Sequence, residues 1–216
     1  MAKKENIIVI CAHSDDQVFG VGGTLAKYAE EGKNVYVIVF SFGWKANIWL
    51  RKEVASEIRV KESQEAGRIL GVKQTIFLGI EEGRFKEQFE EKRICDRLET
   101  IFRRYRPAKI FTHSIDDPHP DHKELAKFVM DFCEIINFKG DIFAFDVWNP
   151  LPIQTRELPK IVVDISKTFK KKLKALRCFK SQWSSRVALT WKVYWNAYLY
   201  GRQHKCRYAE IFYKMR

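Results

Sequence analysis

The sequence has little cysteine, no paired cysteine motif and no long apolar run. Its five cysteines are odd in number and scattered, and none lies in a Cys-x-x-Cys pair. This usage excludes a disulfide framework and favours reduced thiols. No apolar run approaches the roughly 20 residues that a membrane helix needs, and no secretory signal peptide is visible. We therefore expect a cytoplasmic protein without a membrane partner.

The chain also lacks any block of five or six like charges, although it is basic overall. Lysine and arginine exceed aspartate and glutamate by 39 to 27, which gives a formal net charge of +12. Such an excess is compatible with binding to nucleic acid or to an anionic surface. The densest run, Lys170–Lys172, is typical of the solvated face of a helix. The charge therefore indicates solubility and attraction of acidic ligands, and we expect no nucleic-acid partner.

The order of apolar segments predicts the fold class. The 216 residues include 46% hydrophobic and 31% charged side chains, a globular composition for one domain over residues 1–216. We expect strands at 7–11, 35–40, 75–78, 109–112, 142–147 and 161–165, and helices at 24–31, 52–70, 87–105, 123–136 and 167–180. This alternation predicts an α/β fold, a Rossmann-like three-layer sandwich with a mostly parallel sheet.

Two polar clusters follow the first and the fourth expected strands. His13 and Asp16 lie three residues apart after the first strand, and His119-Pro120-Asp121-His122 follows the fourth. Open α/β sheets bind ligands beyond the C-terminal ends of their strands, so the two clusters are expected to meet. Zinc in hydrolases takes three protein ligands and keeps a water in the fourth position. The clusters offer two histidines and an aspartate, with either His119 or His122 as the second histidine.

The remaining groups of these clusters suit amide hydrolysis. Asp15 is placed to take a proton from a metal-bound water, whose pKa falls to about 7. The histidine left over, held by Asp121, would stabilise an oxyanion as an imidazolium or protonate a leaving amine. The alternative interpretation of the second cluster is a capped helix start, with Asp121 as the N-cap.

A glycine-rich stretch needs a separate interpretation. Gly20, Gly22 and Gly23 resemble a dinucleotide-binding loop only loosely, because Leu25 stands where its third glycine is needed. We interpret Gly22 and Gly23 as allowing close packing at the start of a helix, and we disfavour a Rossmann oxidoreductase.

The tail from residue 182 to residue 216 is rich in tryptophan and tyrosine. The first interpretation is a helix that packs its aromatic stripe on the body of the domain. The alternative is that some of these side chains form a pocket wall or the interface of a homo-oligomer. Pocket walls are also expected from segments 41–50 and 147–156.

The two clusters resemble the signatures of the LmbE/PIG-L family of zinc-dependent N-deacetylases. That family shows A-H-P-D-D-E and then G-G-T, and here residues 12–17 read AHSDDQ and residues 22–24 read GGT. The second signature, H-P-D-H, is intact at 119–122. Arg59-x-x-Glu62 resembles the family's long helix and 208–212 its C-terminal pattern, so the resemblance covers almost the whole chain.

The resemblance implies a role for each of these residues. It implies that zinc, or another divalent metal such as Fe²⁺, is bound by His13, Asp16 and His122. It implies that Asp15 is the general base and that His119, oriented by Asp121, stabilises the oxyanion or acts as an acid. It also implies that Arg59 holds a polar group of the substrate, whereas the alternative is an exposed arginine paired with Glu62.

Two positions depart from the family's pattern. Ser14 replaces a proline. A proline would fix φ at this position of the turn, so the serine leaves the turn less constrained. Gln17 replaces a glutamate, which keeps the hydrogen-bonding reach but loses the charge. Neither change removes a ligand or the base, so we expect an active enzyme.

The resemblance implies that the chain removes an acetyl group from an N-acetylated, N-acetylglucosamine-type amino sugar or its conjugate. One alternative keeps the metal site but cleaves another amide or an ester, phosphoesters included. Another alternative is a basic nucleic-acid-binding protein with a vestigial site.

Overall fold

The computed structural model describes residues 4–44, 50–148 and 158–216, so the predicted pocket walls lie partly outside it. Within these ranges one α/β domain is built on a seven-stranded sheet of order β3-β2-β1-β4-β5-β7-β6. The strands are β1 (Asn6–Cys11), β2 (Asn34–Ser41), β3 (Gln74–Ile80), β4 (Lys109–His113), β5 (Asp141–Phe145), β6 (Lys160–Asp164) and β7 (Ala209–Lys214). Pairs among β1 to β5 are parallel, whereas β7 is antiparallel to β5 and β6. The predicted fold class is confirmed.

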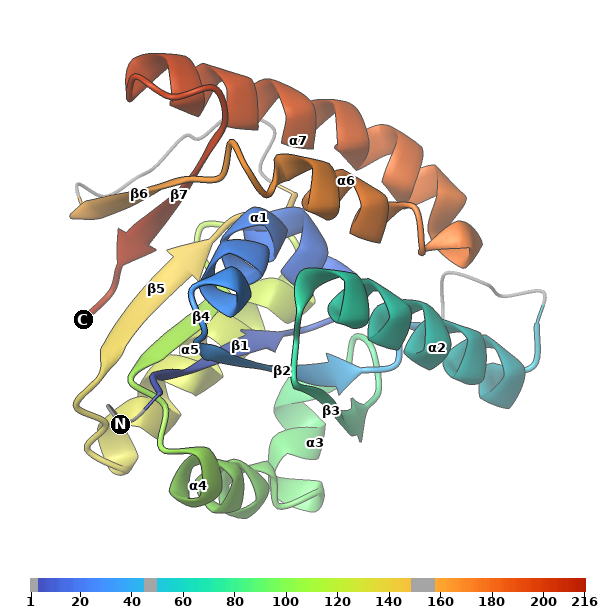
Figure 1. Cartoon of the computed structure of the whole chain (residues 1–216). Helices are drawn as coiled ribbons and strands as arrows, with labels where there is room; N and C mark the ends of the chain where they lie inside the picture. The colour runs from blue at the N-terminus through green and yellow to red at the C-terminus, as the bar shows by residue number, and fades with distance from the viewer. Residues whose placement is uncertain (1–3, 45–49, 149–157) are drawn as a thin grey trace.

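Helices cover both faces of the sheet (Figure 1). One face carries α1 (Asp16–Glu30), α2 (Lys52–Leu70), α6 (Phe169–Leu176) and α7 (Trp183–Gln203), and the other carries α3 (Phe85–Glu91), α4 (Ile94–Tyr105) and α5 (Pro120–Ile135). A short 3₁₀ helix spans Lys180–Gln182. Alternate residues of β1 pack into the two separate cores on either side of the sheet. Burial on both faces explains why this strand is apolar throughout.

Helix α1 begins at Asp16, eight residues before the predicted start at residue 24, so the predicted start of this helix was wrong. The glycines belong to the helix interior, where they contact other elements. A Cβ on Gly20 would overlap the ring of Phe145, and one on Gly23 would lie 2.6 Å from Ile165. The glycines therefore allow close packing along the helix rather than at its beginning.

Two other predictions differ from the structure in instructive ways. The long helix predicted at 87–105 is divided into α3 and α4 at Arg93, whose φ of 49° is left-handed. Strand β7, in the aromatic tail, was not predicted. By contrast, α2 has the predicted bounds, and Gly71 ends it with a φ of 79°. No helix among the described residues is long and apolar enough to cross a membrane.

Candidate active site

The two polar clusters meet at the C-terminal ends of β1 and β4, which are neighbours in the sheet. Asp15 occupies the N-cap position of α1, so the cluster after β1 is held by the first turn of that helix. His119 is the N-cap of α5, and Pro120 follows it in the first turn. Because both helices start at the same sheet edge, residues about 100 positions apart come into contact, as predicted.

Three donor atoms converge at the centre of this site. His13 Nδ1 lies 3.2 Å from His122 Nε2 and 3.3 Å from Asp16 Oδ2, and His122 Nε2 lies 3.4 Å from the same oxygen. All three residues are buried. Zinc bonds of about 2.0–2.1 Å in tetrahedral geometry put two ligand atoms about 3.3–3.4 Å apart. The spacing and the chemistry of these donors therefore fit one tetrahedral metal ion.

The outer nitrogens of the two histidines lie close to carboxylates. His13 Nε2 lies 3.2 Å from Asp121 Oδ2, and His122 Nδ1 lies 3.0 Å from Asp117 Oδ1. Metal-ligating histidines usually pair their second nitrogen in this way, which fixes the ring orientation. Within the described residues, two further groups with metal-ligand spacing overlap the central one: His13, His119 and Asp121, and His113, Asp117 and His122. Both include one of these outer carboxylates.

Asp117 was not predicted, because no sequence motif contains it. Its side chain is fully buried, and Oδ2 accepts hydrogen bonds from the backbone amides of Val147 at 2.8 Å and Trp148 at 3.1 Å. Burial alone would raise the pKa of this carboxyl, but His122 and the backbone amides hold it well below its usual range. Asp117 therefore stays ionised and links the segment after β5 to His122.

Asp15 and Arg59 form a buried pair beside the three donors. Arg59 Nη2 lies 3.6 Å from Asp15 Oδ1, and Arg59 Nε donates a 2.8 Å hydrogen bond to Ser14 Oγ. Burial raises the pKa of Asp15, and the guanidinium opposes that rise. The alternative of an exposed Arg59 paired with Glu62 is wrong, because Glu62 instead accepts hydrogen bonds from Ser181 at 2.8 and 2.6 Å.

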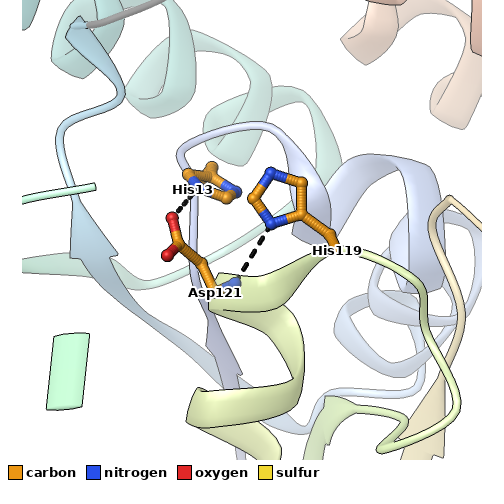
Figure 2. Close-up of side chains that lie close together, drawn as sticks. All are labelled: His13, His119 and Asp121. Atoms are coloured by element: carbon orange, nitrogen blue, oxygen red, sulfur yellow. Dashed lines mark hydrogen bonds and ion pairs between the residues drawn. The ribbon is translucent and has the colours of Figure 1, made fainter. Parts of the chain in front are cut away.

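His119 and Asp121 are arranged differently from the prediction (Figure 2). His119 is itself the N-cap of α5, and its Nδ1 accepts a 3.2 Å hydrogen bond from the backbone amide of Asp121. The Asp121 carboxylate contacts His13 instead, and it accepts a 3.0 Å hydrogen bond from the amide of Gly83. Asp121 therefore orients His119 through its backbone and His13 through its side chain.

This arrangement defines the protonation of His119. A ring whose Nδ1 accepts a hydrogen bond is neutral and carries its proton on Nε2. Burial lowers the pKa of His119, and the neighbouring His13 lowers it further. The hydrogen bond from the Asp121 amide therefore favours a neutral ring that can donate a hydrogen bond from Nε2, whereas the sequence predicts an imidazolium.

Gln17 lies among uncharged partners. Its Nε2 donates hydrogen bonds to the Ser14 carbonyl oxygen at 2.9 Å and to Ser63 Oγ at 3.0 Å, and its Oε1 lies 3.7 Å from Cys11 Sγ. The side chain is buried, so a neutral amide suits this position.

A cavity of about 130 Å³ adjoins the donor atoms. It is lined by His13, Asp15, Asp16, Phe19, Arg59, Glu82, His119, Val147, Trp148, Gln182 and Leu189. Two of the three proposed ligands, His13 and Asp16, thus open on one space together with Asp15 and His119, and this space is large enough for a small polar group to reach them.

Residues 8–133, more than half of the chain, match the family model described as PIG-L: GlcNAc-PI de-N-acetylase. The chain belongs to this family of deacetylases. It is 28% identical over 226 residues to the diacetylchitobiose deacetylase of Thermococcus kodakarensis, which covers 95% of this chain and 81% of that relative. The structure of the N,N'-diacetylchitobiose deacetylase from Pyrococcus horikoshii superposes with a TM-score of 0.82 at 25% identity, over 98% of this chain and 84% of that one.

One relative is named for a different reaction. The 4-oxalmesaconate hydratase of Pseudomonas putida is 29% identical over 211 residues, covering 86% of this chain and 79% of the relative. A relative of this similarity is thus named for the addition of water rather than for deacetylation, and the site has to be judged on its own groups.

Proposed function

We propose that this chain is a zinc-dependent deacetylase that hydrolyses the acetamide of an N-acetylated amino sugar or of its conjugate. The observation that carries the proposal is the set of three donor atoms, 3.2–3.4 Å apart, beside a buried carboxylate. Membership of the family and the deacetylase names of several relatives support it.

His13, Asp16 and His122 hold the metal in this proposal. Two imidazole nitrogens and one carboxylate oxygen are a common ligand set of zinc hydrolases, and Fe²⁺ can take the same donors. When bound, such an ion lowers the pKa of a coordinated water to about 7 and polarises a carbonyl oxygen. Asp121 and Asp117 keep the two imidazole rings in their orientations, so the rings need little rearrangement when the metal binds.

Asp15 acts as the general base. Its carboxylate lines the cavity, beside Asp16 in the chain, and is held by Arg59 Nη2 at 3.6 Å. Since burial raises its pKa, Asp15 is a better proton acceptor than an exposed aspartate. It takes the proton from the attacking water and can deliver it to the leaving amine nitrogen.

His119 stabilises the oxyanion that forms on the acetyl carbonyl. The hydrogen bond from the Asp121 amide to Nδ1 leaves the Nε2 proton free for donation in the cavity. A donor fixed before the reaction is worth more than one that must reorient. The same ring would stabilise the negative charge that develops when another amide or an ester is hydrolysed.

The experiment is a screen for amine release from N-acetylated sugars, with metal content measured on the same samples. We expect release of acetate and free amine from at least one N-acetylglucosamine derivative, and loss of activity in a His13→Ala variant. His204→Ala, at an exposed histidine, is the matched control and should behave as the parent does. If the metal-loaded protein deacetylates none of these sugars, the proposal fails.

A second candidate reaction is addition of water to a carbon–carbon double bond, which the identity to the hydratase favours. An unsaturated carboxylic acid that absorbs in the ultraviolet distinguishes it, because hydration removes the absorbance without releasing acetate. We propose the deacetylase reaction because the family model and most named relatives agree on it.

We also propose that the protein acts in a reducing compartment, the cytoplasm. All five cysteines are free thiols, and two of them are buried, which supports this assignment.

A further inference from the structure

Lys192 lies on the buried side of α7, close to the active site. Only 7% of this residue is exposed, and lysine is almost never buried without a partner. Its Nζ donates a 2.5 Å hydrogen bond to the carbonyl oxygen of Val147, which lines the active-site cavity. Burial lowers the pKa of Lys192, whereas the carboxylates of Asp146 and Asp117 favour its charged form. Its target is therefore a backbone group at the wall of the active site.

The peptide group between Val147 and Trp148 joins this lysine to Asp117. Its carbonyl oxygen accepts the hydrogen bond from Lys192, and its N–H donates to Asp117 Oδ2 at 3.1 Å. The carbonyl and the N–H of a planar trans peptide group point in opposite directions, so fixing one fixes the other. The ammonium group thus aims the Trp148 amide at the Asp117 carboxylate. The amide of Val147 donates to the same oxygen at 2.8 Å.

A continuous chain of contacts thus leads from α7 to a proposed metal ligand. The other oxygen of Asp117, Oδ1, lies 3.0 Å from His122 Nδ1. An ammonium at one end of a peptide group and a carboxylate at the other polarise it in the same direction, which strengthens both hydrogen bonds in a low-dielectric interior. The position of Asp117 behind His122 therefore depends on a charge that lies outside the two polar clusters.

Another buried lysine, Lys172 of α6, shows by contrast what is unusual about Lys192. Both line a cavity of about 70 Å³ between α1, α7, β5 and β7. Lys172 is neutralised by Glu210, whose Oε1 lies 2.6 Å from its Nζ, and it donates a 2.8 Å hydrogen bond to the Phe19 carbonyl oxygen. Lys192 instead donates to an uncharged carbonyl oxygen and makes no direct ion pair among the described residues. Holding the backbone is therefore the role that its burial supports.

We propose that Lys192 is a positioning residue of the metal site, which holds the peptide group between Val147 and Trp148 so that Asp117 stays behind His122. This inference rests on the proposed function, because it concerns the metal ion that His122 would hold. Val147 and Trp148 also line the active-site cavity, so the same hydrogen bond fixes part of its wall. The buried side of α7 thereby contributes to the site without providing a ligand.

Zinc affinity, measured by competition with a chelator, tests the proposal without turnover. Lys192→Met keeps most of the length of the side chain but removes the donor. We expect its zinc affinity to fall about tenfold, at the lower end of the effects of groups behind ligating histidines. Lys192→Arg keeps both the donor and the charge, and the adjoining cavity offers space for the larger guanidinium. It should recover most of the lost affinity.

A double-mutant cycle separates this role from a general effect on the fold. Asp117→Asn removes the carboxylate through which Lys192 would act, so adding Lys192→Met to it should lower zinc affinity little further. Hydrogen exchange of the Trp148 amide should be faster in Lys192→Met than in the parent, because the peptide group has lost its anchor. Losses of affinity that multiply fully in the cycle would mean that Lys192 acts independently of Asp117, which overturns the proposal.

Two buried neighbours in the same cavity provide controls. Lys172→Met removes an ammonium group that donates to Phe19 rather than to Val147, and Val193→Ala, at the next residue of α7, removes only packing. Both should lower Tm and keep the zinc affinity of the parent. If Lys192→Met does not fold, Lys192→Gln, which retains an uncharged donor on a shorter side chain, replaces it in every comparison.

The outcomes distinguish the positioning role from the proposed function. Parental zinc affinity in folded Lys192→Met, or an equal loss of affinity in Val193→Ala, overturns the positioning role and leaves the deacetylase proposal standing. A parent that binds no zinc and releases no acetate from N-acetylated sugars overturns both.

Discussion

The carboxylate of Asp117 lies 3.0 Å from the outer nitrogen of His122, and it is buried with both of its oxygens engaged. This contact joins one proposed metal ligand to the backbone that follows β5. Asp121 makes the corresponding contact to His13 at 3.2 Å. Both imidazoles are thus oriented before a metal arrives.

Replacing Asp117 should therefore weaken metal binding without removing a ligand. For Asp117→Asn we expect a loss of about 10–100-fold in zinc affinity, because carboxylates behind ligating histidines have effects of this size. Competition with a chelator measures the affinity. Asp131→Asn, at an exposed position of α5, provides the comparison. An unchanged affinity in Asp117→Asn contradicts the orienting role.

Replacing the base should separate catalysis from metal binding. Asp15→Asn should lower kcat by about 10²–10⁴-fold, the usual contribution of a general base. Its metal content should remain that of the parent, because Asp15 is not among the three central donors. Parallel metal analysis and acetate release measure this, and activity within tenfold of the parent removes Asp15 from the mechanism.

His119 distinguishes the central group of metal ligands from the group formed by His13, His119 and Asp121. His119→Ala should lower kcat by about 10²–10³-fold, as loss of an oxyanion donor does, while the metal stays bound. If the metal is lost with this ring, the group formed by His13, His119 and Asp121 is the binding site, and the proposed ligand set is wrong.

The glycines of α1 should respond to substitution according to their contacts. Gly20→Ala should destabilise the fold by about 1–3 kcal/mol, because its new Cβ would overlap the Phe145 ring. At Gly22 the nearest atom is the flexible Lys172 Cγ at 3.3 Å, and alanine is favoured in a helix interior by about 1 kcal/mol. Gly22→Ala should therefore be neutral or stabilising. Equal effects of the two substitutions on Tm would contradict this packing account.

Asp146 should give the stability a pH dependence. Burial and the nearby charge of Asp117 together raise the pKa of Asp146 to about 6, against the opposing charge of Lys192. A raised folded-state pKa means that the folded state binds the proton more tightly, so stability falls as pH rises from about 4 to about 6. Asp146→Asn removes this loss. Its Tm relative to the parent should increase between pH 5 and pH 7.5, by an amount equivalent to roughly 1 kcal/mol. A difference in Tm between the variant and the parent that stays constant over this pH range would contradict the raised pKa of Asp146.

The sheet edge and the two clusters were predictable because their signals are local. Continuous apolar strands such as 7–11 and polar residues directly after them place side chains at the C-terminal edge of a parallel sheet. The end of α2 was predictable for the same kind of reason, since Gly71 adopts the left-handed conformation that glycine favours.

The parts that sequence patterns missed depend on tertiary contacts. The start of α1 was misplaced because glycines disfavour helices, and only their contact with Phe145 and Ile165 explains them. Asp117 has no motif, and its importance comes from amides 30 residues away. The state of His119 depends on one backbone hydrogen bond at the start of α5, which no residue spacing specifies.

The central claim is that His13, Asp16 and His122 form the metal site of a deacetylase, and Asp16 is the ligand that belongs to this group alone. The most direct measurement determines metal stoichiometry and acetate release on the same samples of the parent and Asp16→Ala, with circular dichroism to confirm the fold. We predict one ion per chain and acetate release for the parent, and loss of both in folded Asp16→Ala. Stoichiometric metal and undiminished acetate release in Asp16→Ala would contradict the claim.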